Sequence, residues 1–406
     1  MQNNSLLNKS IQKKPVLSTT IAIDSEHSVF HFYSMEGTSA STIAHYVKRY
    51  TGNLFGEGFF DKFKDALREY SMRIPSDTVR KVTVVLPDKA VLTDIIKLPT
   101  MQGFGQTRKA LSVTLESIYR NFEELRGGSH VVDQNKQFST FAVTAVQKQV
   151  VSSIYSACSE NKMLVDSLSY ESGAAVTGAQ ILNPRLKNSS FLFLDIKDIY
   201  TRCVFVTKGK PLGYYKLPFG SKLLREFEPI AEESLFNHSF ADLAVYSAKN
   251  KAKSDKNTGD EQDYSNAARR EMQNAAMLMS ASYADIEKPP RDIPEALVRE
   301  VPDTQEDIRY ENFRIFVKWA LSLIENNDRL TDLAAPEFVC VNLPDDLADV
   351  IDKTNAENAG DDSKGKNKTN LPFIRVTGDG MNVNIVSNLE LYGGLFPKLI
   401  APTGTL

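Results

Sequence analysis

The chain has 406 residues, with 48 basic and 51 acidic side chains and a formal net charge of −3. This length predicts two or three domains and excludes a single small domain. Because acidic and basic residues are mixed along the sequence, no broad basic surface is available to release counterions from nucleic acid. We therefore expect no nucleic-acid partner.

The cysteines and the N-terminus indicate the compartment. Cys158, Cys203 and Cys340 lie far apart in apolar runs, without the spacing of a metal site, and predict buried free thiols in a reducing compartment. Residues 1–20 lack the continuous apolar stretch of a signal peptide or a membrane span. We expect a cytoplasmic protein with a flexible tail at residues 1–18, which reaches a membrane only through a partner.

The opening segment has the pattern of a sheet followed by helices. Residues 19–33 carry apolar side chains on both sides of Asp24 and then alternate, which predicts two strands joined by a tight turn. Residues 41–52 and 59–74 have apolar residues at three- and four-residue spacing, so helices are predicted there. Residues 79–99 return to the pattern of strands.

The following region contains a module and then a repeat of the opening. Helices are predicted at residues 107–122 and 167–182, and a strand that runs into a helix at 137–161. Residues 82–150 thus form a strand-rich module with one helix, inserted in the first half. The opening pattern recurs at residues 191–220, about 170 residues later, which indicates an internal duplication.

The last part of the chain mixes ordered and flexible segments. Residues 250–308 are rich in charge and proline, which indicates mobility, with one helix-prone stretch at 267–282. The pattern then predicts an amphipathic helix at residues 308–326 and a buried strand at residues 336–347. A second flexible insert is predicted at residues 354–370, followed by a strand at 374–386 and a terminal helix at 389–400.

Two halves that each open with a strand, an acidic turn and a strand resemble the actin superfamily. The stretch VTVVLPDKAVLTDIIKLPTM at residues 82–101 is similar to the PilM branch, and the match continues in order outside residues 1–18, 250–308 and 353–370. The resemblance implies an α/β class: a duplicated actin-like (RNase H-like) two-domain fold with an inserted small α+β subdomain, of the FtsA/PilM type.

The resemblance also implies how the chain divides into subdomains. The terminal helix is expected to pack back on the first subdomain. The first subdomain is expected at residues 19–81 and 151–185, and the inserted subdomain at residues 82–150. The second subdomain is expected at residues 186–235 and 331–406. A helical subdomain is expected at residues 236–330, and it contains the mobile insert 250–308.

In the family that this chain resembles, each half offers a D-x-G turn to the phosphates of ATP, and carboxylates hold Mg²⁺. The positions that match are Asp24 and Ser25 in the first turn, Asp195 and Thr201 in the second, and Glu171 at a helix start. The resemblance therefore implies ATP and Mg²⁺ as the cofactors to test. An open alternative is that the aspartates only end strands and bond turn amides.

The nucleotide motifs depart from the family pattern. Glu26 and Lys197 replace the turn glycines, and a left-handed turn costs a non-glycine residue about 1–2 kcal/mol. Asn342-Leu343-Pro344 replaces the Gly-Gly expected beside adenosine, so the backbone cannot closely approach a purine. We expect weak or lost ATP binding and no efficient ATPase.

By resemblance, the chain is a scaffold of type IV pilus assembly. It is expected to hold the tail of a PilN-like single-pass membrane protein in a groove beside the inserted module, to meet a pilus assembly ATPase or platform proteins, and to self-associate. The partner-binding residues implied are Val91, Ile95, Ile96 and Leu98, although their alternation also fits core packing.

Two other function classes stay open. An FtsA-like, membrane-tethered division protein would need a C-terminal amphipathic helix, and this sequence ends in APTGTL. An actin-fold ATP-dependent enzyme would need the phosphate and adenosine glycines that are replaced here. The sequence does not distinguish pilus, secretion and competence systems, and it does not define the oligomeric state or the role of residues 250–308.

Overall fold

The structure is a computed structural model of the chain, and it divides into two compact units. Unit 1 comprises residues 1–185 and 380–406, and unit 2 comprises residues 186–379. The structure describes residues 16–36, 43–74, 78–101, 103–119, 122–217, 220–226, 305–325, 330, 333, 335–360, 371–376, 388–395 and 404–405.

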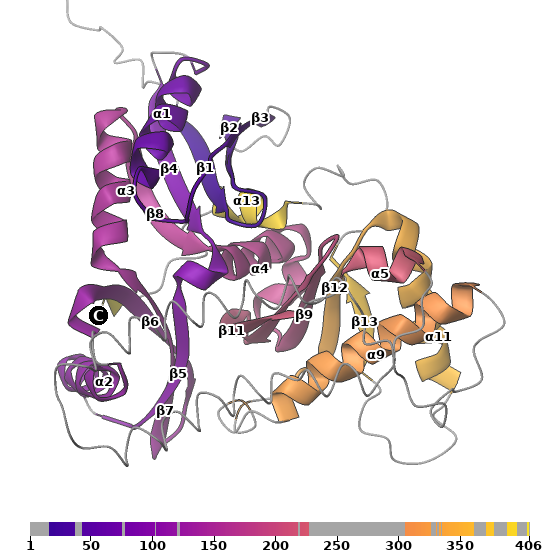
Figure 1. The fold of residues 1–406 in the computed structure, drawn as a ribbon. Coiled ribbons are helices and arrows are strands. Elements are labelled where there is room, and N and C mark those ends of the chain that lie inside the picture. Colours follow the sequence, from indigo (N-terminus) through magenta and orange to yellow (C-terminus); the bar gives the residue numbers. More distant parts are fainter. Residues whose placement is uncertain are drawn as a thin grey trace, which may run out of the picture. The chain divides into compact units, whose positions relative to one another are not determined.

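Unit 1 contains a five-stranded mixed sheet, which we call the first sheet (Figure 1). Its strands are β1 (Val16–Asp24), β2 (Val29–Glu36), β3 (Ile43–Arg49), β4 (Val79–Leu86) and β8 (Leu164–Tyr170). The strand order is β3-β2-β1-β4-β8, in which β1 is antiparallel to β2 and parallel to β4. The buried middle of β1 therefore lies at the centre of the unit.

Unit 2 contains a second five-stranded sheet. Its strands are β9 (Phe191–Ile196), β10 (Thr201–Thr207), β11 (Lys210–Leu217), β12 (Phe338–Asn342) and β13 (Phe373–Arg375). The order is β11-β10-β9-β12-β13, and β9 is antiparallel to β10 and parallel to β12. Each position and direction repeats that of the first sheet, which confirms the predicted duplication.

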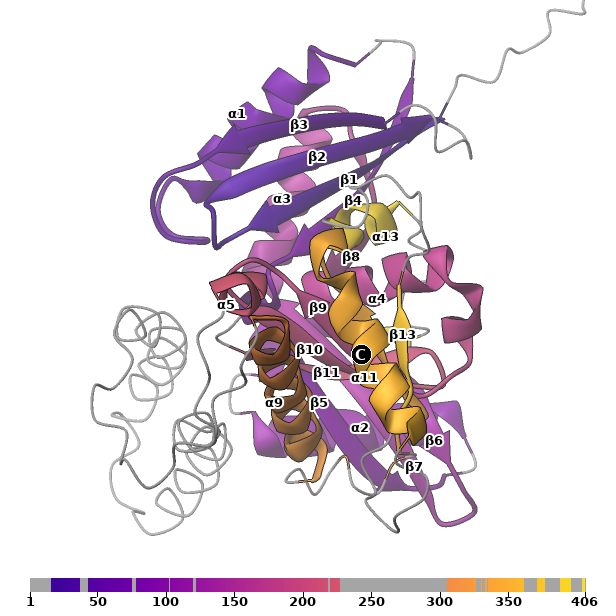
Figure 2. The ribbon, with the colours of Figure 1, turned by 90° about the vertical axis from the view of Figure 1, so that its right-hand side faces the viewer.

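Helices cover both faces of the first sheet (Figures 1 and 2). α1 (Phe59–Ser71) and α3 (Lys148–Glu160) cover one face with a core that is rich in aromatic and branched side chains. α4 (Glu171–Leu182) and the short α13 (Leu389–Gly394) cover the other. Burial on both faces explains why the central strands read as continuous apolar runs.

The contact between α4 and α13 is made by backbone. A Cβ atom on Gly178 would lie 2.4 Å from the Leu389 carbonyl oxygen, and one on Gly393 would lie 1.9 Å from the Ala174 carbonyl oxygen. Only residues without a side chain allow this approach. Residues separated by about 210 positions in the sequence are thus joined in one layer of unit 1.

A separate four-stranded sheet, with the helix that covers it, forms what we call the inserted module. Its strands are β5 (Leu92–Pro99), β6 (Leu125–Gln134), β7 (Phe138–Gln147) and β14 (Gly404–Thr405), in the order β14-β6-β7-β5. α2 (Phe104–Ile118) packs on one face, where Leu111 and Leu115 meet Ile96, Leu98 and Phe141.

The module begins later than the predicted range 82–150. That range starts inside β4, because residues 82–86 continue the parallel ladders with β1 and β8 in the first sheet. The module's own sheet starts at Leu92, after a single 3-10 turn. The four 3-10 turns in the described residues are η1 (Asp88–Ala90), η2 (Phe122–Glu124), η3 (Pro184–Lys187) and η5 (Asp345–Leu347).

Three helices of unit 2 are described. They are α5 (Ser221–Glu226), α9 (Gln305–Glu325) and α11 (Ala348–Gly360). α9 contacts α11, and the Phe313 ring of α9 lies 5.7 Å from the Phe373 ring of β13. The Asn355 side chain of α11 bonds both the N–H and the carbonyl of Phe373, which fixes the edge of the second sheet.

Two predicted elements are wrong. Residues 41–52 are not helical, because Ile43–Arg49 pairs along its length with β2 as the third strand of a meander, and the Tyr46 ring lies 5.5 Å from the Phe32 ring in a tilted arrangement. The predicted flexible insert 354–370 starts within α11, where Thr354 is buried. Pairing and packing decide both segments against the local pattern.

Other predictions fall mostly outside the described residues. They include most of the mobile insert at 250–308, although α9 begins before its end, and the whole of the helix predicted at 267–282. Of the strand predicted at 374–386, the structure describes only its start as β13.

Candidate functional site

In the first predicted phosphate turn, the aspartate side chain bonds the backbone of the turn itself. Asp24 ends β1, and its Oδ1 accepts hydrogen bonds from the N–H groups of Glu26 (2.8 Å) and His27 (3.0 Å). Ser28 then takes a left-handed conformation with φ of 53° before β2 begins. Ser25 lies in this turn, half-buried. The side chain that would help bind a phosphate or Mg²⁺ is thus engaged by its own turn.

Three histidines of the first sheet gather beside this turn. Asp24 Oδ2 lies 2.7 Å from His27 Nδ1 and 3.6 Å from His31 Nε2, and His31 Nδ1 lies 3.2 Å from His45 Nε2. Burial opposes ionisation of Asp24, but hydrogen bonds from His31 and His27 outweigh it and hold the pKa of Asp24 well below its usual range. The sequence places His27 and His31 on one hairpin, but nothing in it indicates that His45 joins them, because residues 41–52 have the pattern of a helix.

The histidine cluster does not form a metal centre. His31 turns one ring nitrogen to Asp24 and the other to His45, so the side chains do not converge on one point. Among the described residues, no group of three or more His, Cys, Asp or Glu side chains is placed to hold a metal ion.

The cluster predicts a pH dependence of stability. Burial, and the nearby His31, lower the pKa of His45, so the folded state binds fewer protons than the unfolded state below the normal histidine pKa of about 6.5. We expect the free energy of unfolding to fall as pH drops from about 7.5 to about 5.5, and His45→Gln to reduce that slope. Urea unfolding at several pH values measures it; an unchanged slope in the variant would contradict the assignment.

Acidic groups surround the first turn. The Tyr50 hydroxyl donates to the Asp24 carbonyl oxygen at 3.3 Å. Burial, and then the carboxylates of Asp24, Glu171 and Glu26, raise the pKa of Tyr50 to about 12. Asp24 and Glu171, two of the positions predicted for a phosphate site, thus both lie near the Tyr50 hydroxyl in unit 1. Glu26 lies there as well, and a third carboxylate repels phosphate oxygens.

Glu171 has a structural partner at the start of α4. Its Oε2 accepts the Asp88 N–H of η1 at 3.3 Å. In return, Asp88 accepts hydrogen bonds from the Ser172 N–H (2.8 Å) and the Ser172 hydroxyl (2.7 Å). The two carboxylates thus cap each other's helical turns, as acidic residues commonly do at helix N-termini.

The second predicted phosphate turn contains a buried ion pair. Asp195 is the penultimate residue of β9 and has no exposed side-chain surface, and its Oδ2 lies 2.8 Å from Arg202 Nη1 on β10. Arg202 is itself 2% exposed. Asp195 Oδ1 also accepts a hydrogen bond from Asn342 of β12 at 2.8 Å, and Lys197 Nζ lies 3.3 Å from Oδ2. This carboxylate is fully engaged by protein groups.

The backbone closes the same turn. The Lys197 and Asp198 carbonyl oxygens accept hydrogen bonds from the N–H groups of Ser221 (2.8 Å) and Lys222 (2.9 Å) at the start of α5. A Cβ atom on Gly220 would lie 2.3 Å from the Lys197 carbonyl oxygen, so the two segments are in direct contact. Thr201, the predicted hydroxyl ligand, is only 1% exposed at the start of β10.

These two turns do not fit ATP with Mg²⁺. In unit 2, Arg202 and Lys197 already supply the positive charge that a carboxylate-held Mg²⁺ would supply, and Asn342 takes the other oxygen of Asp195. In unit 1, Glu26 adds negative charge where a phosphate would need positive charge or backbone N–H groups. Leu343, at the position expected for an adenosine glycine, is a buried side chain.

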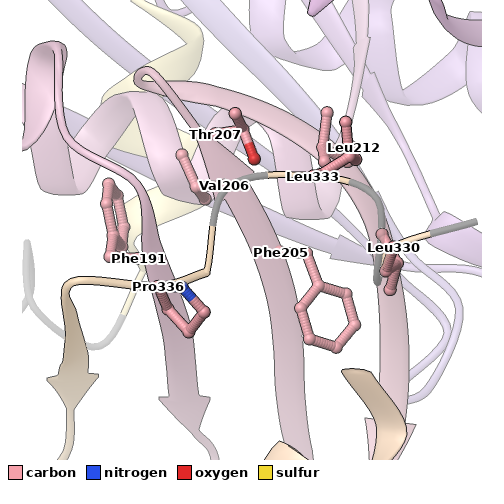
Figure 3. Close-up of a pocket in the computed structure, with 8 residues that line it drawn as sticks. All are labelled: Phe191, Phe205, Val206, Thr207, Leu212, Leu330, Leu333 and Pro336. Carbon is pink, nitrogen blue, oxygen red and sulfur yellow. The ribbon is translucent and has the colours of Figure 1, made fainter. Parts of the chain in front are cut away.

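The apolar cavity drawn in Figure 3 lies in unit 2 and is too small for a cofactor. Its volume is about 20 Å³, roughly the space of one water molecule. It is lined by Phe191, Phe205, Val206, Thr207, Leu212, Leu330, Leu333 and Pro336.

The four predicted partner residues divide into two pairs. Ile96 and Leu98 are buried beneath α2 and belong to the module's own core. Ile95 lies on the opposite face of β5 and is half-buried, and Val91 is a partly buried residue that packs against the core of the first sheet. Only Val91 and Ile95 therefore remain candidates for direct contact with a partner.

Comparisons with known proteins identify the fold. No family model matches the chain, and no curated protein matches it. A chain of the PilM–PilN type IV pilus biogenesis complex aligns with a TM-score of 0.50 and 14% identity, over 95% of this chain and 99% of that chain. This chain has the PilM-type, actin-like fold. The resemblance predicted from sequence is thus confirmed at the level of fold.

Two other solved structures align less closely. A ROK family protein from Streptococcus pneumoniae, in complex with sucrose, has a TM-score of 0.40 and 12% identity, over 94% of this chain and 96% of that chain. The ethanolamine utilization protein EutJ from Carboxydothermus hydrogenoformans has a TM-score of 0.35 and 10% identity, over 94% and 90%. No described helix of the PilM-type chain is long and apolar enough to cross a membrane.

Proposed function

We propose that this chain is a non-catalytic, actin-like scaffold of a type IV pilus or a related secretion or competence system. In this role it works at the cytoplasmic face of a membrane and binds the cytoplasmic tail of a PilN-like single-pass protein. Other assembly proteins, such as an assembly ATPase or a platform protein, would then join the complex, and copies of the chain would associate within it.

The observation that carries this proposal is the full-length likeness to PilM. The alignment spans 95% of this chain and 99% of the other, so it includes both units and the inserted module. The known complex pairs PilM with PilN. A scaffold of this kind uses its surface to hold an extended peptide, which requires apolar contacts and no reacting groups.

The geometry of the two turns supports a function without ATP hydrolysis. At the two described turns, Mg²⁺ and phosphate would have to displace protein groups from the Asp195–Arg202 pair and meet the carboxylates around Asp24. An FtsA-like polymer or an actin-fold enzyme would use the nucleotide, and this arrangement favours neither.

The tail is proposed to contact the partly exposed side of β5. Ile95 is the apolar residue at the middle of this side, and Val91 lies where the module joins the first sheet. An apolar segment of the tail would bury both side chains, at about 25 cal/mol per Å² of apolar surface.

We expect Ile95→Glu to weaken binding of the tail at least about tenfold, because a charged group must be desolvated in an apolar contact. The ligand is a synthetic peptide of the N-terminal cytoplasmic tail of a PilN-like single-pass protein, and calorimetry measures the affinity with and without Mg-ATP. Val113→Glu is the matched control, because Val113 is an exposed apolar residue on α2, 56% exposed.

The outcomes separate the parts of the proposal. Equal affinity of the Ile95 and Val113 variants would remove β5 from the contact. Absence of peptide binding by the unaltered chain would contradict the scaffold function. Tail affinity that depends on Mg-ATP would show that the nucleotide site is retained and would favour the enzyme or FtsA-like alternatives.

A further inference from the structure

The outer edge of β6 is paired with a segment from the far end of the sequence. Gly404 lies opposite Ser129, and Thr405 lies opposite Gly128, in antiparallel register. β14 thus covers two of the ten residues of β6. Among the described residues, no other strand pairs with this side of β6.

The sequence of β6 suits the addition of a short strand. Gly127 and Gly128 lack side chains, and the first of them packs so closely on β7 that a Cβ atom would lie 2.3 Å from the Thr144 carbonyl oxygen. The register with β7 shifts between Val131 and Asp133, which marks a bulge. A bulge increases twist and ends pairing, so strand addition is confined to the part of β6 before it.

The opposite edge of the same sheet is protected. On β5, the Ile95 N–H donates to Asp94 Oδ1 at 2.8 Å, and Asp94 Oδ2 accepts the Tyr119 hydroxyl at 2.7 Å. Pro99 ends the strand and has no N–H to donate. An inward-facing charge and a proline are devices that block edge pairing, and β6 has neither within residues 125–131.

The segment that supplies β14 is tethered to the other part of unit 1. α13 is packed on α4 beside the first sheet, and eight residues lie between Leu395 and Gly404 in the numbering. The nine Cα–Cα steps from Leu395 to Gly404 span up to roughly 30 Å when extended. Pairing of β14 with β6 therefore joins the inserted module to the layer formed by α4 and α13.

We propose that the outer edge of β6 is a strand-addition site, that residues 404–405 of the same chain occupy it, and that they close it to extended segments of other chains. Main-chain hydrogen bonds give such a site its affinity, and the small residues at positions 127–129 make it tolerant of sequence. The site follows from the pairing of β14 alone, so it stands whether or not the chain serves a pilus.

The experiment compares the full chain with its Thr405→Pro variant by hydrogen exchange. Proline removes an N–H and disfavours a strand, so we expect the amides of Gly128, Ser129 and their immediate neighbours in β6 to exchange about tenfold faster in the variant. Residues 138–147 of β7 are the internal control and should keep their protection. A synthetic peptide of residues 398–406, added in excess, should restore the protection of β6, and the same peptide with Thr405→Pro should not.

Each result decides the proposal. Faster exchange confined to β6, reversed by the unaltered peptide, supports a strand-addition site with an internal occupant. Unchanged exchange in β6, equal acceleration in β7, or failure of the peptide to restore protection would each overturn it. Because the tail peptide of the proposed partner is not used, this outcome is independent of the scaffold test.

Discussion

Replacing Arg202 by methionine is expected to lower the free energy of unfolding by about 3 kcal/mol. The change removes the guanidinium that lies 2.8 Å from Asp195 and leaves a carboxylate with no exposed surface inside unit 2. Lys197 remains at 3.3 Å, so part of the charge stays compensated. Chemical denaturation followed by circular dichroism measures the loss.

A matched substitution and a double variant test the cause. Arg225 also pairs with an aspartate, Asp346, at 2.8 Å, but both groups are substantially exposed, so Arg225→Met should cost less than about 1 kcal/mol. Adding Asp195→Asn to Arg202→Met should recover much of the lost stability, because an amide can still bond Asn342 without a charge. Equal losses in the two single variants would show that the buried ion pair contributes no more to the free energy of unfolding than the exposed pair.

Gly393→Ala is expected to destabilise unit 1 by about 3 kcal/mol, despite the better helix propensity of alanine. The added Cβ would lie 1.9 Å from the Ala174 carbonyl oxygen and 2.7 Å from the Gly178 nitrogen. Both are backbone atoms of α4, so α13 must move away as a whole. Hydrogen exchange of residues 174–178 and chemical denaturation report this undocking.

Gly105→Ala is the matched control for the glycine contact. Gly105 lies in α2, and a Cβ atom there would meet no atom within 4 Å. The same substitution should therefore stabilise the chain by about 0.5–1 kcal/mol, because only the propensity effect remains. If both variants shift stability in the same direction, the close contact of α13 with α4 is wrong.

The buried pair also bears on the expectation of weak or lost ATP binding. The negative charge of the buried Asp195 carboxylate must be compensated by neighbouring groups. In this chain those groups belong to Arg202, Lys197 and Asn342. These contacts compensate the charge of Asp195 from within unit 2.

The candidate site was predicted in part. The sequence identified Asp24 and Asp195 as strand-end acids and noted that glycine is missing from both turns. It did not indicate that Arg202 would face Asp195, because the two residues become neighbours only through the antiparallel register of β9 and β10. It likewise did not indicate that His45 lies beside His31, which requires β3 to be a strand.

The sequence by itself determined the duplicated order of strands, because apolar runs, alternation and turns are local properties that each half repeats. It also determined that Glu26 and Lys197 stand where the family has glycine. Only the tertiary structure decided that β3 pairs with β2, that Ile96 and Leu98 are core residues, and that Gly178 and Gly393 meet. Those outcomes depend on which distant segments come into contact. The energy of such a contact depends on both segments together, so the local sequence of one segment does not determine it.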